Sequence, residues 1–296
     1  MATMAARAAR VRSKKHMSAR GSALVYVVTG TALAVLFLAP LVWAVLRSFM
    51  PPADITAAPS AKAFGHLTVA NYTGLISGSI HILRYVGNSL LVAGGTAVLT
   101  AVLATFAGYG LGRPRFRFRG ANVVFALILV TLMVPFQAIL TPLFLELAFL
   151  HLLDSRLGLI LFYSTYNLPF GVFVMRNSFM MVPSELEEAA YTDGATLLRT
   201  LRSVLLPVVV PGVATTMLYA FLFAWTEFLG ALTFITSISR MTLPVALLNV
   251  ETGTFGTVNF GYLIAGAVIA MVPCAVLYVT LQRFYVTGIT AGGVKG

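Results

Sequence analysis

Cysteine, histidine and acidic residues are scarce in this chain. Its 296 residues include one cysteine, Cys274, four histidines and nine Asp and Glu residues. A lone cysteine excludes a disulfide framework and a cysteine-based metal site. Only His66 and His81 share a loop, so we expect no metal site built from histidines either.

Charge of either sign is also sparse. Charged residues make up 10% of the chain and hydrophobic residues 59%, and the mean hydropathy is +0.92. Six stretches contain no charged residue: 21–46, 85–112, 120–145, 157–175, 203–226 and 252–282. Each is long enough for a helix that crosses a bilayer core, which takes about 20 residues. The sequence therefore predicts an all-α, polytopic membrane protein with six transmembrane helices, and it excludes a large aqueous catalytic domain.

The basic residues give the chain a formal net charge of +11. If the N-terminus is cytoplasmic, 15 Lys and Arg residues lie on the inner side of the predicted helices and five on the outer side. This bias is the positive-inside pattern, which places both termini in the cytoplasm and the basic residues near membrane lipid. No basic patch alternates with a nucleic-acid reading element, so we expect no nucleic-acid partner.

The basic start is similar to that of a secretory signal peptide, but the first charge-free stretch of 26 residues is too long. A signal core has about 7 to 15 residues, so we expect this stretch to remain as the first helix. The predicted regions are a basic cytoplasmic tail over 1–22, a transmembrane domain over 23–284 and a cytoplasmic tail over 285–296.

Four arginines lie in the short loop Arg113–Gly120 between the second and third predicted helices. Next to the anionic inner leaflet they are expected to act as a topological anchor. A phosphate-binding or base-stacking strip of alternating Arg and Phe is the alternative interpretation of this loop.

A larger cytoplasmic loop, 183–207, is predicted to form a helix, a sharp turn and a second helix. Ser184 can cap the first helix while Glu187 reaches back to the cap amide. Gly194 permits the turn, and Pro207 is expected to end the second helix before the membrane.

This loop resembles the EAA loop of permeases in binding-protein-dependent ABC importers. The matching residues keep the spacing of that motif, with Val where Ile is commonest: Glu188, Ala189, Ala190, Gly194, Val204, Leu206 and Pro207. The resemblance implies that the helix before Gly194 docks on a separate ATPase subunit, with Asp193 and the small residues of the motif at the contact.

The chain further resembles the smaller, six-helix permease of maltose-type carbohydrate importers, which implies a type I importer fold. The shared features lie from about residue 70 onward: Asn88-Ser89-Leu90, Pro135, Asp193-Gly194-Ala195, Trp225-Thr226-Glu227-Phe228 and Gly292-Gly293-Val294-Lys295-Gly296. Thr226 replaces the asparagine that is usual there, so no role of that asparagine carries over. The resemblance also implies that Gly293, Lys295 and Gly296 reach the ATPase dimer.

No phosphate-binding loop is recognisable. Gly288 and Gly293 have the required spacing, but Val294 occupies the position of the essential lysine. We therefore expect no cofactor in this chain, with ATP and Mg²⁺ bound by a partner ATPase present in two copies. The other partners that the resemblance implies are a second permease subunit and an extracytoplasmic solute-binding protein, all at a bacterial plasma (inner) membrane.

Polar residues within the apolar stretches are the remaining candidates. Glu227 is expected near the outer end of the fifth helix, where a carboxylate is tolerable without a partner. Trp225, Glu227 and Asn88 are candidates for the translocation path or for contact with the binding protein. The alternatives are an interfacial anchor for Glu227 and interhelical hydrogen bonding for Asn88, Gln137, Asn167 and Asn259.

The predicted function is that of a non-enzymatic permease subunit that imports a sugar, an oligosaccharide or a sugar-like polyol phosphate. An ion-coupled secondary carrier is the first alternative, but it would want ionisable groups at mid-membrane, and the chain shows no internal repeat. An intramembrane enzyme is the second, but clustered nucleophiles or carboxylates are absent outside the EAA loop.

Overall fold

The computed structural model describes residues 2–55, 66–78, 80–116, 118–256 and 258–293. Within these residues, five helical runs are long and apolar enough to cross a membrane. They are α1 (Ala2–Ser48), α4 (Ile82–Gly112), α7 (Arg156–Met180), α9 to α10 (Leu197–Thr226) and α13 (Phe260–Gly293). The predicted all-α membrane fold is confirmed. α1 is helical on both sides of residue 22, and α13 continues through residues 285–293.

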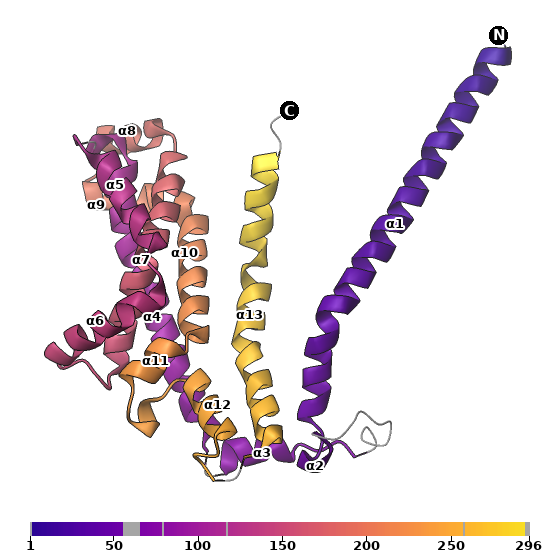
Figure 1. The fold of residues 1–296 in the computed structure, drawn as a ribbon. Helices are drawn as coiled ribbons and strands as arrows, with labels where there is room; N and C mark the ends of the chain where they lie inside the picture. Colours follow the sequence, from indigo (N-terminus) through magenta and orange to yellow (C-terminus); the bar gives the residue numbers. More distant parts are fainter. Residues whose placement is uncertain (1, 56–65, 79, 117, 257, 294–296) are drawn as a thin grey trace.

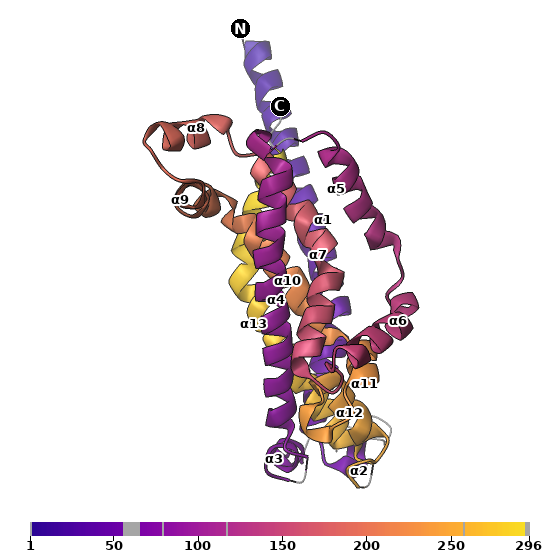
Figure 2. The same ribbon diagram turned by 90° about the vertical axis from the view of Figure 1, so that its left-hand side faces the viewer.

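Pro135 divides the third apolar stretch, which was predicted as one helix. α5 (Ala121–Val130) with the short turn η3 (Thr131–Met133) meets α6 (Phe136–Phe149) at an angle of 100°. Val134 is extended, with φ −75° and ψ 120°, because the ring of a following proline disfavours helical backbone. The third stretch is therefore a bent pair, which Figure 2 shows curving along one side of the bundle.

The prediction that Pro207 ends a helix is wrong. The chain stays helical through α9 (Leu197–Thr200), the π-helical turn η4 (Leu201–Leu205) and α10 (Leu206–Thr226). Proline has no N–H to donate to the preceding turn, and a local π-helical turn is one way in which a helix adjusts to such a break.

Three helices, α4, α7 and α10, pack together as the centre of the molecule. A Cβ atom placed on Gly171 of α7 would lie 2.9 Å from both Ala104 of α4 and Thr216 of α10. The three helices approach one another closely because glycine has no side chain there, as small residues permit in membrane helix packing.

α1 and α13 run along the length of the molecule, and most of the short helices lie at its two ends (Figure 1). α8 (Ser184–Thr192) lies at the end where α1 begins and α13 finishes. The short elements at the opposite end are α2 (Pro52–Ile55), α3 (Ala70–Ser77), α11 (Leu229–Phe234), η5 (Ile238–Arg240) and α12 (Leu243–Glu251). The remaining short turn, η2 (Pro114–Phe116), directly follows α4.

Candidate functional site

The EAA segment folds as α8 followed by a tight turn, but the predicted capping box does not form. Pro183 occupies the N-cap position, with φ −54° and ψ 137°, and no side chain caps the helix. Ser184 is the first helical residue, and the Glu187 side chain does not turn back toward the cap amide. Glu187 instead lies 5% exposed beneath the helix, where a buried arginine offers a charged partner.

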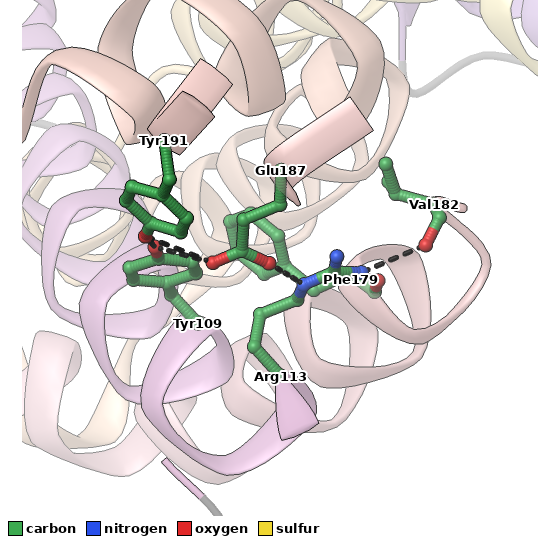
Figure 3. A network of polar contacts seen from close by, with 6 residues as sticks. All are labelled: Tyr109, Arg113, Phe179, Val182, Glu187 and Tyr191. Atoms are coloured by element: carbon green, nitrogen blue, oxygen red, sulfur yellow. Dashed lines mark hydrogen bonds and ion pairs between the residues drawn. The ribbon is translucent and has the colours of Figure 1, made fainter. Parts of the chain in front are cut away.

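That partner is Arg113, the residue that follows α4 (Figure 3). Its Nε donates to Glu187 Oε2 at 2.5 Å, and the two side chains are 2% and 6% exposed. The guanidinium Nη1 also donates to the backbone carbonyls of Phe179 and Val182, at 3.0 and 2.7 Å. The end of α4, the end of α7 and α8 are thereby joined through one side chain.

Two tyrosines complete the surroundings of the Glu187 carboxylate. The hydroxyls of Tyr109 on α4 and Tyr191 on α8 each donate to Glu187 Oε1 at 3.1 Å. Hydrogen bonds to a charged group in such a dry place are stronger than the same bonds in water. We call Tyr109, Arg113, Glu187 and Tyr191 the α8 anchor.

The anchor changes the interpretation of the arginine loop. Arg113 was expected to face lipid with the other arginines, but it is buried. The Arg115 guanidinium lies over the Tyr191 ring, 4.1 Å from its centroid, as a cation–π contact. Arg117 lies outside the described residues. At least two of the four arginines therefore hold α8 in place.

The EAA residues fall on two different faces of α8. Glu188 and Ala189 are exposed, as are Asp193 and Gly194 after the helix, whereas Ala190 is only 8% exposed. The expectation that Ala189 and Ala190 both meet a partner is therefore wrong for Ala190, which packs inside this chain. Leu186 is 43% exposed beside Glu188, so the outer face of α8 combines acidic and apolar groups.

Gly194 makes the predicted turn, for a conformational reason. Its φ is +76°, and its amide donates to the Tyr191 carbonyl at 3.0 Å, while the amide of Ala195 donates to Ala190. Only open space surrounds the position that a Cβ atom would occupy. Glycine is favoured at this position because other residues rarely adopt positive φ.

Other motif residues lie away from the outer face of α8. Leu206 packs partly buried against the core below α8, and Pro207 is exposed at the start of α10. Gly293 is the last described residue of α13, and Lys295 and Gly296 lie outside the described residues.

At the opposite end, Trp225 and Glu227 serve the packing of this chain. Trp225 is 3% exposed, and its Nε1 donates to the Ala270 carbonyl at 3.1 Å. A carboxylate is tolerable at this position without a partner, but Glu227 has several. Its carboxylate accepts the Tyr163 hydroxyl at 2.5 Å and the amides of Leu229 and Gly230 at 2.8 and 2.9 Å. It therefore caps α11.

Asn88 is likewise buried, at 4% exposure. Its Nδ2 donates to the carbonyls of Ser239 and Met241 at 3.0 and 2.8 Å, and its Oδ1 accepts from Arg156 at 3.0 Å. These bonds bring the α11–α12 connection against the starts of α4 and α7. Asn88 therefore positions this connection.

Asp154, which was not singled out from the sequence, fixes the same connection. Its carboxylate accepts from the Ser237 hydroxyl and from the amides of Thr236 and Ser237, and it pairs with Arg240. The pKa of Asp154 is lowered, chiefly by the hydrogen bond from the Ser237 hydroxyl and further by the backbone hydrogen bonds and Arg240.

Metal coordination has no support in the part of the chain that the structure describes, where no three His, Cys, Asp or Glu side chains lie close enough to hold an ion.

Comparison with known proteins identifies the family of this chain. A family model for the inner membrane component of binding-protein-dependent transport systems matches residues 100–290. The sulfoquinovosyl glycerol transport system permease of Agrobacterium fabrum is 35% identical, over 87% of this chain and 88% of that protein. The diacetylchitobiose uptake system permease of Streptomyces coelicolor is 32% identical, over 91% and 96%.

The fold has a counterpart among solved structures. A chain of a bacterial ABC transporter involved in the import of the acidic polysaccharide alginate superposes with a TM-score of 0.75 and 23% identity, covering 90% of this chain and 98% of that one. These findings support neither the ion-coupled carrier nor the intramembrane enzyme. The chain belongs to the family of inner membrane components of binding-protein-dependent transport systems, and it is a non-catalytic, membrane-spanning permease subunit of an ABC importer.

Proposed function

We propose that this permease imports a carbohydrate and that α8 is the element through which a separate ATPase drives it. The observation that carries the proposal is the α8 anchor: one face of α8 is fixed to the ends of α4 and α7, and the other is exposed. A helix fixed on one side and open on the other can receive a force and pass it on.

The anchor suits this task because it resists separation. Pulling Glu187 away from Arg113 would leave two unpaired charges in a site where their side chains are 2% and 6% exposed. Breaking a buried ion pair costs about 3–5 kcal/mol, so displacement of α8 is expected to displace α4 and α7 rather than detach from them.

The outer face of α8 has the chemistry of a docking surface. Glu185 and Glu188 supply negative charge near Leu186, and Met181, just before the helix, is 78% exposed. An ATPase cleft with an apolar floor and a basic rim would complement these groups. Gly194 sets the direction in which the helix ends.

The orientation follows from charge. α8 and the two ends of the chain lie at the same end of the bundle (Figure 1). The loops that carry most of the basic residues lie on the cytoplasmic side under the positive-inside rule, so we assign this end to the cytoplasm. The opposite end, with α3, α11 and α12, then faces the external solute-binding protein.

The rest of the complex is proposed as a second permease and two ATPase subunits, which bind the ATP and Mg²⁺. No residue of α5 is buried within this chain, and its sequence is almost entirely apolar. A face of this kind fits contact with lipid or with another membrane subunit.

The substrate class rests on the relatives. The two transport systems compared above are described for a sulfoquinovosyl glycerol and for diacetylchitobiose, and both are glycosides. We extend this class, although not either compound, to the present permease.

Reconstitution of the complete transporter in proteoliposomes tests the proposal. Uptake of radiolabelled maltose, trehalose, diacetylchitobiose and sulfoquinovosyl glycerol would be measured with and without ATP. ATP-dependent uptake of at least one glycoside, and no ATP hydrolysis by the isolated permease, are expected. Uptake without an ATPase subunit, or ATP-dependent uptake of amino acids or metal ions alone, would contradict it.

A further inference from the structure

The seam between α7 and α10 carries aromatic and hydroxyl side chains along the membrane span. On α10 they recur at spacings of three or four residues, which is the repeat of one helix face. We call the six residues Tyr166, Phe170, Thr215, Tyr219, Phe223 and Thr226 the α7–α10 stripe. Thr226 is exposed, Tyr219 is 41% exposed, and the other four are partly buried.

The aromatic residues of the stripe form two successive pairs. The rings of Phe170 and Tyr219 have centroids 4.0 Å apart and an interplanar angle of 32°. The rings of Tyr166 and Phe223 lie 5.0 Å apart at 26°. Four residues separate the pairs on each helix, a rise of about 6 Å. The stripe is thus a short ladder of aromatic rungs.

The phenol hydroxyls of Tyr166 and Tyr219 have no hydrogen-bond partner in the described part of the chain. Tyr166 is ten residues from the outer end of α7 and Tyr219 seven from the end of α10, so both lie well inside the span. Transfer of an unpaired hydroxyl from water to hydrocarbon costs about 4–8 kcal/mol. The stripe therefore suits a polar surrounding better than lipid.

Other exposed tyrosines have an ordinary explanation. Tyr26 lies six residues after Arg20, and Tyr278 lies five residues before Arg283, so each is close to the charged end of an apolar stretch. Tyrosines at such positions reach the membrane–water interface, where their hydroxyls are hydrated. This explanation does not extend to Tyr166 and Tyr219.

The other side of α10 has the composition of a lipid-facing surface. The exposed residues of α4 between positions 90 and 106 are Leu90, Leu91, Val98, Val102, Leu103 and Phe106. Val213 and Met217 of α10 continue this apolar surface in a groove against α4. The stripe side of α10 thus carries hydroxyls together with rings that pair with α7, whereas on the other side Phe221 stacks on Trp225 of the same helix.

We propose that the α7–α10 stripe lines the translocation path of this subunit and contacts the sugar as it passes. Aromatic rings pack against the C–H faces of a sugar ring, and phenol and threonine hydroxyls bond to its hydroxyl groups. The rungs would let a sugar move from one weak site to the next. This inference rests on the proposed carbohydrate import for the ligand, but the water-exposed path can be tested without a ligand.

The first test uses single cysteines in the complete transporter with Cys274→Ser as background. Phe170→Cys, Tyr219→Cys and Thr226→Cys are compared with the α4 variants Val98→Cys, Val102→Cys and Phe106→Cys. The probe is the small anionic reagent 2-sulfonatoethyl methanethiosulfonate, applied with and without ATP and vanadate. At least tenfold faster modification of the stripe in one of the two states is expected.

Equal, slow modification of both sets in both states would overturn the path. It is the result expected if lipid or the second permease covers the stripe. If glycosides are imported but the stripe is unreactive, the path alone fails. If the stripe reacts but no glycoside is imported, the path stands and the proposed substrate class fails.

The second test addresses contact with sugar. A saturating amount of whichever glycoside is transported should slow modification of Tyr219→Cys about threefold or more. Tyr219→Phe should raise the KM for uptake about 3- to 10-fold, the effect of one lost hydrogen bond, while Tyr278→Phe should change it less than twofold. Reaction without protection, together with an unchanged KM in Tyr219→Phe, would overturn the sugar contact.

Discussion

Glu187 and Glu188 are neighbours in sequence, yet their carboxylates lie in different surroundings, one buried and one exposed. Glu187 is 5% exposed and pairs with Arg113, whereas Glu188 is exposed to solvent. One holds the helix to the membrane bundle, and the other lies where a partner can reach it.

This difference predicts that a Glu→Gln substitution has different effects at the two positions. Glu187→Gln should lower the stability of the permease and greatly reduce uptake, because Arg113 loses its buried counter-charge. Glu188→Gln should leave stability unchanged and weaken ATPase binding. Thermal unfolding in detergent and co-purification with the ATPase separate the two effects. Indistinguishable phenotypes would show that the anchor has no separate role.

The ion pair can be replaced as well as broken. Removing one buried partner should cost about 3–5 kcal/mol, whereas replacing both with apolar residues of similar size is often neutral. Arg113→Met with Glu187→Leu should therefore recover much of the stability that either single change loses. Additive losses in this double-mutant cycle, measured by unfolding, would exclude an energetic coupling of the two residues.

Ala189 and Ala190 form a second matched pair. Ala189→Trp adds bulk on the exposed face, so it should release the ATPase and abolish uptake with normal membrane insertion. Ala190→Trp overpacks a buried position and should reduce the amount of folded permease, at a cost of about 1–3 kcal/mol. Quantitative blotting of membranes, beside an ATPase pull-down, distinguishes them. A well-folded Ala190→Trp variant would refute its buried placement.

Gly194 is predicted to matter through its backbone conformation. Gly194→Ala places a Cβ in open space but at φ +76°, which costs about 1–2 kcal/mol. Gly110→Ala is the control, since its Cβ also meets open space but within regular helix, where alanine is favoured. Uptake should fall in Gly194→Ala, fall further in Gly194→Val and stay unchanged in Gly110→Ala. Equal uptake by Gly194→Val and wild type would contradict the role of the turn.

Asp154 predicts a pH dependence at the outer end. Its folded-state pKa is lowered, so its stabilising contribution is full above the unfolded pKa and is lost as pH falls through the lower folded value. Asp154→Asn should lower the unfolding temperature at pH 7, and the difference should shrink below about pH 4. A constant difference down to the lowest measurable pH would rule out the carboxylate charge as its source.

Membrane orientation can be checked by labelling. In the Cys274→Ser background, Thr236→Cys should react with an impermeant maleimide from outside intact cells, and Ala195→Cys should not. Labelling of Ala195→Cys from outside would invert the orientation and remove the argument for an ATPase at α8.

The sequence alone was sufficient for the membrane class, the helical fold, the family and the turn at Gly194. Each of these depends on local properties: uninterrupted apolar stretches, a motif at fixed spacing and a residue type that tolerates positive φ. Pro135 also carried a local signal for the bend between α5 and α6, because proline restrains the residue before it.

Tertiary structure decided which motif residues are exposed and which are internal. Arg113 and Glu187 are 74 positions apart, and no periodicity links them. Asn88 finds its partners at Ser239 and Met241, more than 150 positions away. Burial of Ala190 beside exposed Ala189 likewise depends on where α8 sits. A sequence records which groups can pair, but the folded chain selects the partners, because a buried charge or amide bonds to whatever packing brings within reach.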